Sequence, residues 1–389
     1  MPEFIDFGKF RVGYASVGGD TDPYQLDLTY ELLGFNYNGY PLGNISQPTV
    51  PNRLLRPLSV SEFEVGFDVR FFKNRLGIDM AFYDKLTKND ITQETLTATS
   101  GYNGASVNVG KLRNRGAELL IYGTPVQTSA FSWDISLNGS YNKSKVLKIS
   151  NQASELNLGS RGKASVRLIE GEEYAQIVGP AIERNEQGQD IISNDGLNIV
   201  NRGNVVSFGS GIHKWNMGIT NTINYKSFAL SFLVDGKFGA KLYSVSSYEL
   251  DHRGMTVKSL LGRADGAILP GVKQSDGKPN DIMVTPSMAG NRLIVINRRE
   301  ALNDYLYNAS FIKLRSIALT YNFSKGVLNS VRFIKGASIS LVGNNLALLM
   351  THAKQIDPDG NWSTGNAQGI EASNLPPIKS YGVDIKLKF

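Results

Sequence analysis

The sequence predicts an all-β protein built as an antiparallel transmembrane β-barrel. Segments along the chain alternate apolar and polar residues, which is typical of strands with one apolar and one wet face. Short turns and long loops also alternate between these segments, and aromatic residues flank the short turns. Together these features are the sequence signature of a membrane barrel with short periplasmic turns and long extracellular loops.

The C-terminal segment, Ser380–Phe389, carries the alternation most clearly. Its apolar positions are separated by small or charged residues, and the chain stops on an aromatic residue. A soluble sheet can also end on such a strand, so the fold class depends on whether the rest of the chain repeats the pattern. The apolar positions are Tyr381, Val383, Ile385, Leu387 and Phe389.

Composition excludes several classes of protein. The formal charge of +6 is spread along the 389 residues without a run of five like charges, which gives no argument for a nucleic-acid partner. The lack of cysteine excludes disulfides and thiolate metal sites. No apolar stretch is long enough for a transmembrane helix, and the N-terminus lacks the pattern of a signal peptide. We therefore expect either a cytoplasmic protein or the C-terminal piece of a longer one.

About ten strands are expected, most of them in hairpins. Lys9–Val17 is the first, and Ser380–Phe389 is the last. Glu62–Phe72 and Leu76–Tyr83 form a hairpin by their alternation and by the short turn Lys73-Asn74-Arg75 between them. Three further hairpins pair Val107–Tyr122 with Phe131–Val146, Trp215–Tyr225 with Phe228–Val234, and Phe311–Phe323 with Phe333–Leu349.

The long connections fall near residues 18–58, 149–212, 246–305 and 351–378, all at one end of the predicted sheet. A soluble sandwich or a large lipocalin-like barrel could show the same alternation within one strand. Greek-key links in a sandwich do not gather the long loops at one end, so the membrane barrel is favoured. Phe311–Arg315 (FIKLR) breaks the alternation, which indicates a bulge or a position above the bilayer.

Specific motifs match a known family along nearly the whole chain. They include Phe10–Gly18, Leu58–Tyr83, Ala309–Phe323, Asp357-Pro358-Asp359 and Ser380–Phe389. With these motifs the chain resembles the C-terminal part of the SusC/RagA-like TonB-dependent transporters of Bacteroidetes outer membranes. One departure is His213-Lys214-Trp215, where the family usually shows a Pro-Lys pair.

The resemblance implies that residues 1–389 are about the last ten strands of a barrel of about 22 strands. The family's signal sequence, plug, TonB-contact segment and earlier strands have no counterpart here. We therefore expect a fragment, or one half of a split transporter. A half barrel leaves two strand edges open, and lipid tolerates no unpaired edge. The chain alone should thus not insert as a stable unit.

The resemblance also implies a function and its partners. The family imports glycans or peptides with energy from TonB, under a SusD-like surface lipoprotein that serves as a lid. In an outer-membrane location, the terminal strand would be read by the barrel assembly machinery. Tyr102, Tyr248 and Trp362 are candidates for substrate contact in the mouth loops. The side chains expected to face the lumen are Glu62, Glu64, Asp68, Arg70, Asp79, Asp134 and Asn138.

Neither catalysis nor a metal or cofactor is predicted. No Gly-x-Ser-x-Gly, His-Glu-x-x-His or P-loop motif occurs. Asp357, Asp359 and Asn361 alternate like part of a calcium loop, but the bidentate Glu of an EF-hand does not follow, so a solvated turn is preferred. Two alternatives remain, an outer-membrane barrel enzyme and a soluble carbohydrate-binding β domain, of which the latter would purify without detergent.

Overall fold

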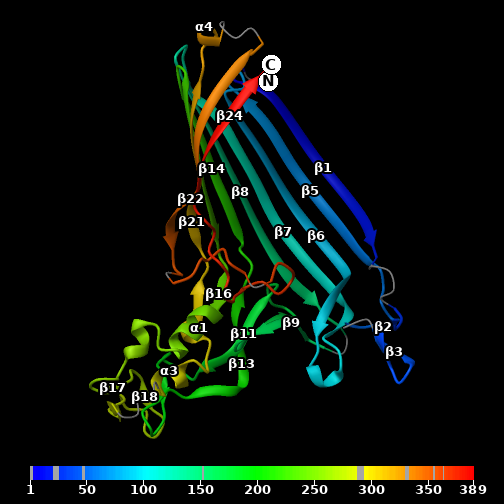
Figure 1. The fold of residues 1–389 in the computed structure, drawn as a ribbon, viewed down its shortest axis with the longest axis vertical. Coiled ribbons are helices and arrows are strands. Elements are labelled where there is room, and N and C mark those ends of the chain that lie inside the picture. Colours follow the sequence, from blue (N-terminus) through cyan, green and yellow to red (C-terminus); the bar gives the residue numbers. More distant parts are fainter. Residues whose placement is uncertain are drawn as a thin grey trace.

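A computed structural model describes residues 3–20, 26–45, 49–150, 153–286, 293–328, 333–353, 355–361 and 363–389. Its dominant feature is one large antiparallel sheet, seen as a tall wall of strands in Figure 1. A short strand, β4 (Thr49–Val50), pairs in parallel with one strand of this wall. The strands of the wall are, in spatial order, β1 (Ile5–Gly19), β5 (Leu58–Phe71), β6 (Leu76–Thr95), β7 (Gly104–Gln127), β8 (Phe131–Lys148), β14 (Trp215–Tyr225), β15 (Phe228–Phe238), β21 (Phe311–Asn322), β22 (Gly336–Thr351) and β24 (Ser380–Lys388).

The spatial order of these ten strands is their order in the sequence, and the four predicted hairpins are confirmed. In the turn between β5 and β6, Lys73 and Asn74 have φ angles of 60° and 62°. Tight hairpin turns favour residues with positive φ, because the backbone twist of such turns matches the twist of the flanking strands. The chain therefore runs up and down through the wall without crossovers.

The predicted strict alternation of short and long connections is wrong at one place. β6 continues to Thr95 and β7 begins at Gly104, so only residues 96–103 connect them at the end where long loops were expected. The extended parts of these strands carry polar residues on both faces, as in Lys85-Leu86-Thr87-Lys88. Ladder hydrogen bonds hold them together without an apolar face, which is why the alternation did not reveal them.

The predicted irregularity at Phe311–Arg315 is confirmed as a bulge. On β15, Leu233 pairs with Ser316 and Val234 pairs with Leu314, so Arg315 is an extra residue on β21. The pairing of β21 with β22 shifts register at the same place. A bulge can direct a side chain out of the regular alternation.

One face of the wall exposes a band of large apolar side chains. Phe10, Val12 and Tyr14 on β1 are 61%, 59% and 72% exposed, and Phe10 lies against Phe67 of β5 with ring centroids 5.1 Å apart. Aromatic rings also pair at the short-turn end, as in the stacked rings of Phe333 and Phe389. A water-soluble sheet would cover such a face, so its exposure indicates contact with lipid.

The largest buried core cluster lies in a folded body at the end opposite the two termini (Figure 1), and a second cluster joins this body to Val109 and Leu112 of β7 and Val146 of β8. We call this folded body the loop body. Tyr243, Leu302, Tyr305 and Ile370 are among its fully buried side chains. Its main elements are β9 (Glu155–Arg161), β10 (Ala164–Ile169), β11 (Gln176–Ile182), β13 (Val200–Ser210), β16 (Lys241–Ser244), β20 (Leu306–Asn308), β23 (Ile370–Glu371), α1 (Val245–His252) and α3 (Leu293–Arg298).

Smaller elements complete the chain. No helix in the described ranges is long and apolar enough to cross a membrane. The remaining elements are β2 (Tyr30–Tyr37), β3 (Tyr40–Ile45), η1 (Ala98–Ser100), β12 (Ile191–Ile192), η2 (Val257–Leu260), β17 (Ala267–Ile268), β18 (Val272–Lys273), β19 (Met283–Val284), η3 (Asn303–Tyr305) and α4 (Lys325–Leu328).

The packing of the wall predicts that Gly116→Ala destabilises it. A Cβ at Gly116 would lie 2.4 Å from the Tyr141 carbonyl oxygen and 2.4 Å from the Tyr83 ring. The Tyr83 hydroxyl is held by Asn142 at 3.1 Å, so neither neighbour can give way freely. We expect a loss of about 1–3 kcal/mol in the free energy of unfolding in urea, measured on the folded protein.

Gly139→Ala is the matched control, because no atom lies within 4 Å of a Cβ at Gly139. It should leave the unfolding free energy nearly unchanged. Equal effects of the two substitutions would contradict the packing described for Gly116.

Candidate functional site

The seven side chains predicted to face a lumen share one face of the wall. Residues paired directly across an antiparallel ladder point to the same side. Asp68 pairs with Asp79, Asp79 with Leu120, and Leu120 with Asn138, which forms one row across four strands. Glu62, Glu64, Arg70 and Asp134 lie on this same face by the alternation along their strands. We call it the polar face; that it faces a lumen stays a prediction.

Some of the charges on the polar face are paired or hydrogen-bonded across neighbouring strands. Arg11 of β1 donates two hydrogen bonds to the Asp79 carboxylate, at 2.6 and 3.2 Å. Asp134 accepts a hydrogen bond from the Thr124 hydroxyl at 2.6 Å. Such pairs hold neighbouring strands together and leave the face hydrophilic, as a water-filled or plugged interior requires.

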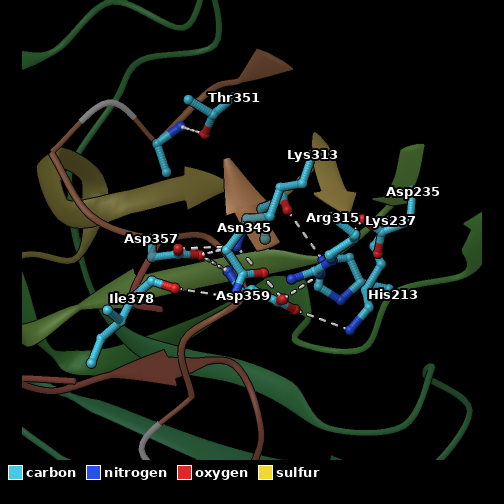
Figure 2. A network of polar contacts seen from close by, with 12 residues as sticks. His213, Asp235, Lys237, Lys313, Arg315, Asn345, Thr351, Asp357, Asp359 and Ile378 are labelled. Carbon is cyan, nitrogen blue, oxygen red and sulfur yellow. Dashed lines mark hydrogen bonds and ion pairs between the residues drawn. The ribbon is translucent and has the colours of Figure 1, made fainter. Parts of the chain in front are cut away.

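A denser network of ion pairs lies where the polar face meets the loop body (Figure 2). The Lys313 ammonium contacts the two carboxylate oxygens of Asp357 at 2.7 and 3.0 Å. Arg315 donates to Asp235 at 2.7 Å and to Asp359 at 2.6 Å. These contacts tie the β22–β24 connection, residues 352–379, to the polar face of β15 and β21.

Two basic residues at the bulge of β21 serve this network. Lys313 pairs with Asp235 in the ladder, and Arg315, two residues further on, is the extra residue of the bulge. Lys237, the next residue of β15 on the polar face, contacts Asp359 at 3.0 Å. Two carboxylates of one loop thus meet three cations of the wall, an arrangement that fixes the loop in position.

Electrostatics keep this loop anchored across the neutral pH range. Burial raises the pKa of Asp359, but hydrogen bonds from Arg315 and Lys237 and nearby positive charges outweigh it and lower that pKa to about 2. Beside the network, burial lowers the pKa of His213, whose ring nitrogen lies 3.1 Å from the Ala309 carbonyl oxygen. The His213 ring also meets the Phe311 ring edge-on. His213 is therefore a packed neutral side chain beside a charged cluster.

The prediction of a solvated turn at Asp357–Asn361 is wrong. Asp357 and Asp359 bind wall cations, and the Asn361 side-chain oxygen accepts a hydrogen bond from the Gly369 amide at 2.8 Å. In the described ranges, no group of three or more His, Asp or Glu side chains is arranged to hold a metal ion. The motif serves as an anchor for the loop.

The three residues predicted to contact substrate in the mouth loops lie in different surroundings. Tyr248 lies in α1 and is 6% exposed, with Arg299 over its ring at 4.6 Å and the Tyr305 ring edge-on. Its faces are covered, so we withdraw it as a substrate contact. Tyr102 is half-buried just before β7 and stays a prediction. Trp362 lies outside the described residues.

The terminal strand β24 pairs with β22 along one edge. Within the described ranges no strand pairs with its other edge, nor with the outer edge of β1. The apolar residues of the terminal segment are exposed, and so are the polar residues between them, because β24 lies at the edge of the described sheet. Its role as an assembly signal stays a prediction.

Sequence reasoning missed most of the ion-pair network. Lys313, Arg315 and Asp235 were not named as site residues, although the broken alternation at Phe311–Arg315 pointed to this place. The buried Glu371, whose carboxylate accepts hydrogen bonds from two serines, was missed as well. Nothing in its local sequence distinguishes it from a loop residue.

Comparison with known proteins shows to which family the chain belongs. The sequence model of the family described as "TonB dependent receptor-like, beta-barrel" matches residues 5–254, more than half of the chain. The chain belongs to this family. Barrels of the family lie in the outer membrane, where this chain therefore belongs, and they are transporter barrels rather than enzymes.

Individual relatives agree with the SusC/RagA resemblance. The chain is 24% identical to TonB-dependent receptor P39 of Formosa agariphila over 99% of its own length, and 23% identical to TonB-dependent receptor SusC of Bacteroides thetaiotaomicron over 98%. It spans only 41% and 37% of those proteins. The structure of the RagAB peptide transporter has the same fold, with a TM-score of 0.73 at 18% identity, over 100% of this chain and 42% of that one.

The network predicts that Asp359→Asn frees the β22–β24 connection. The substitution removes the charge that Arg315 and Lys237 share, which should cost about 1–3 kcal/mol of anchoring. We expect faster cleavage of residues 363–379 by a protease added to intact cells. Asp265→Asn, at an exposed position of the loop body, is the control and should leave cleavage unchanged. Unaltered protection in Asp359→Asn would contradict the anchoring role.

Proposed function

We propose that the chain forms part of the wall and the mouth of a TonB-dependent importer for oligosaccharides or peptides. The observation that carries this proposal is the sheet itself, with exposed aromatic side chains on one face and paired charges on the other. A wall of this kind separates lipid from a hydrophilic interior. Membership in a family of transporter barrels supports the same role.

The mouth would be built by the loop body and by the anchored β22–β24 connection. Substrate would meet these segments first, because they lie at the end away from the short turns. A rigid mouth loop holds its polar groups in fixed positions, which reduces the entropy cost of binding. The ion pairs of Lys313 and Arg315 would supply that rigidity.

Further parts of the importer would lie outside the described wall. A plug inside the barrel would receive energy from TonB, and a SusD-like surface lipoprotein would cover the mouth. The similarity in fold to the RagAB peptide transporter supports this proposal. The terminal segment Tyr381–Phe389 would be recognised by the barrel assembly machinery during insertion.

The proposal is tested by placing an epitope tag in the exposed turn Asn185–Gly188 of the chromosomal gene. We expect the tagged protein in the outer-membrane fraction, in a form whose gel mobility changes on heating, and bound to a surface lipoprotein after detergent extraction. Uptake of a labelled oligosaccharide or peptide mixture should depend on TonB.

A strain lacking residues 380–389 is the assembly control and should lose the heat-modifiable form. Recovery of the tagged protein in the soluble fraction without detergent would overturn the proposal in favour of a soluble β domain.

A further inference from the structure

A cavity of about 370 Å³ lies beside the ion-pair network, between β22 and the connection that follows it. From its lining we propose that this pocket binds a primary ammonium group of the imported substrate. The inference rests on the proposed import function and adds a substrate class to it. The pocket is lined by the carboxylates of Asp357 and Glu371 and by the apolar side chain of Leu348. Its other polar lining residues are Ser246, Gln355 and Asn374.

Glu371 is the key side chain of the pocket. It is 3% exposed, and its carboxylate accepts hydrogen bonds from the Ser244 and Ser246 hydroxyls, both at 2.6 Å. The backbone N–H of Asn374 donates a longer hydrogen bond to this carboxylate, at 3.3 Å. In the ranges that the structure describes, no Lys, Arg or His forms an ion pair with this carboxylate. Glu371 is thus a buried carboxylate whose described partners are all neutral.

Hydroxyl and N–H donors from three neighbours occupy part of the hydrogen-bonding capacity of the Glu371 carboxylate. A carboxylate offers about four acceptor positions, and three of them are used here. A buried charge without a counter-ion is unfavourable, and an incoming cation would relieve this cost. The remaining acceptor position is therefore suited to a positively charged donor.

Asp357 contributes less charge to the pocket, because Lys313 already neutralises it. Its two oxygens contact the Lys313 ammonium at 2.7 and 3.0 Å, and the Asp359 amide N–H donates to it at 2.9 Å. Lys313 is almost completely buried. With two carboxylates lining the pocket and one cation behind them, the pocket keeps a net negative charge.

The pocket lies on the polar face of the wall, which the proposed function places along the path of the substrate. Leu348 pairs with Lys313 in the ladder, so both side chains point to the polar face. Gln355 is exposed at the rim of the pocket. An ammonium group is compact and carries three donors, which matches a small pocket rich in acceptors. Peptides supply this group at the N-terminus and at lysine, and partly deacetylated amino sugars supply it as well.

The test measures binding to the complete receptor, purified in detergent with its lid. The probes are a short peptide and a glucosamine oligosaccharide, each compared with its N-acetylated form. We expect the wild type to bind at least one free-amine probe about tenfold more tightly than its acetylated twin. The probe that shows the preference identifies the source of the amine.

Variants of the pocket sharpen the test. Glu371→Gln should abolish the preference for the free amine, whereas Gln355→Glu, which adds a carboxylate at the rim, should increase it. Glu186→Gln, at an exposed turn of the loop body, is the matched control and should keep the wild-type preference. The heat-modifiable gel mobility of each variant shows whether it is folded. If Glu371→Gln does not fold, Gln355→Glu still tests the proposal.

Equal binding of free and acetylated probes by the wild type, or an unchanged preference in folded Glu371→Gln, would overturn the assignment of the pocket. Either result leaves TonB-dependent uptake by intact cells untouched, so it is distinct from failure of the import function. Loss of the uptake itself would instead refute the proposed function.

Discussion

The structure depends on the hydrogen-bond ladder between neighbouring strands. A bilayer offers no water to backbone N–H and C=O groups, so a sheet in lipid must pair all of them with other strands. Ten strands in sequence order satisfy this requirement through most of the wall. The outer edges of β1 and β24 would need further strands to meet it in a membrane. This agrees with a chain that spans about two fifths of the relatives it matches.

The ladder also determines where function can be located. In a sheet whose one face meets lipid, only the opposite face and the strand ends can carry charges at low cost. The ion pairs of Arg11 with Asp79 and of Arg315 with Asp235 and Asp359 all lie on the polar face or at its outer end. Most of the buried core lies in the loop body for the same reason. The wall contributes to the core only at the ends of β7 and β8, where Val109, Leu112 and Val146 pack against the loop body.

Periodicity predicted the strands of the wall, because one lipid-facing side leaves a repeat of two residues in the sequence. It underestimated the length of β6, because the part of a strand beyond the apolar band needs no apolar face. It also missed the loop body, whose core joins Tyr243 to Ile370 across a long stretch of sequence. Contacts of this kind leave no local pattern. The burial of Tyr248 and the pairing of Lys313 with Asp357, 44 positions apart, were unpredictable for that reason.

The central claim, that one face of the wall meets lipid and the other does not, can be measured directly. The chain has no cysteine, so single cysteines can be placed along β5 without background. With a fluorophore at Phe63→Cys or Phe67→Cys, quenching by lipids that carry nitroxide groups in their acyl chains should be strong. At Glu64→Cys or Asp68→Cys it should be weak. Equal quenching at all four positions in the assembled receptor would contradict the account.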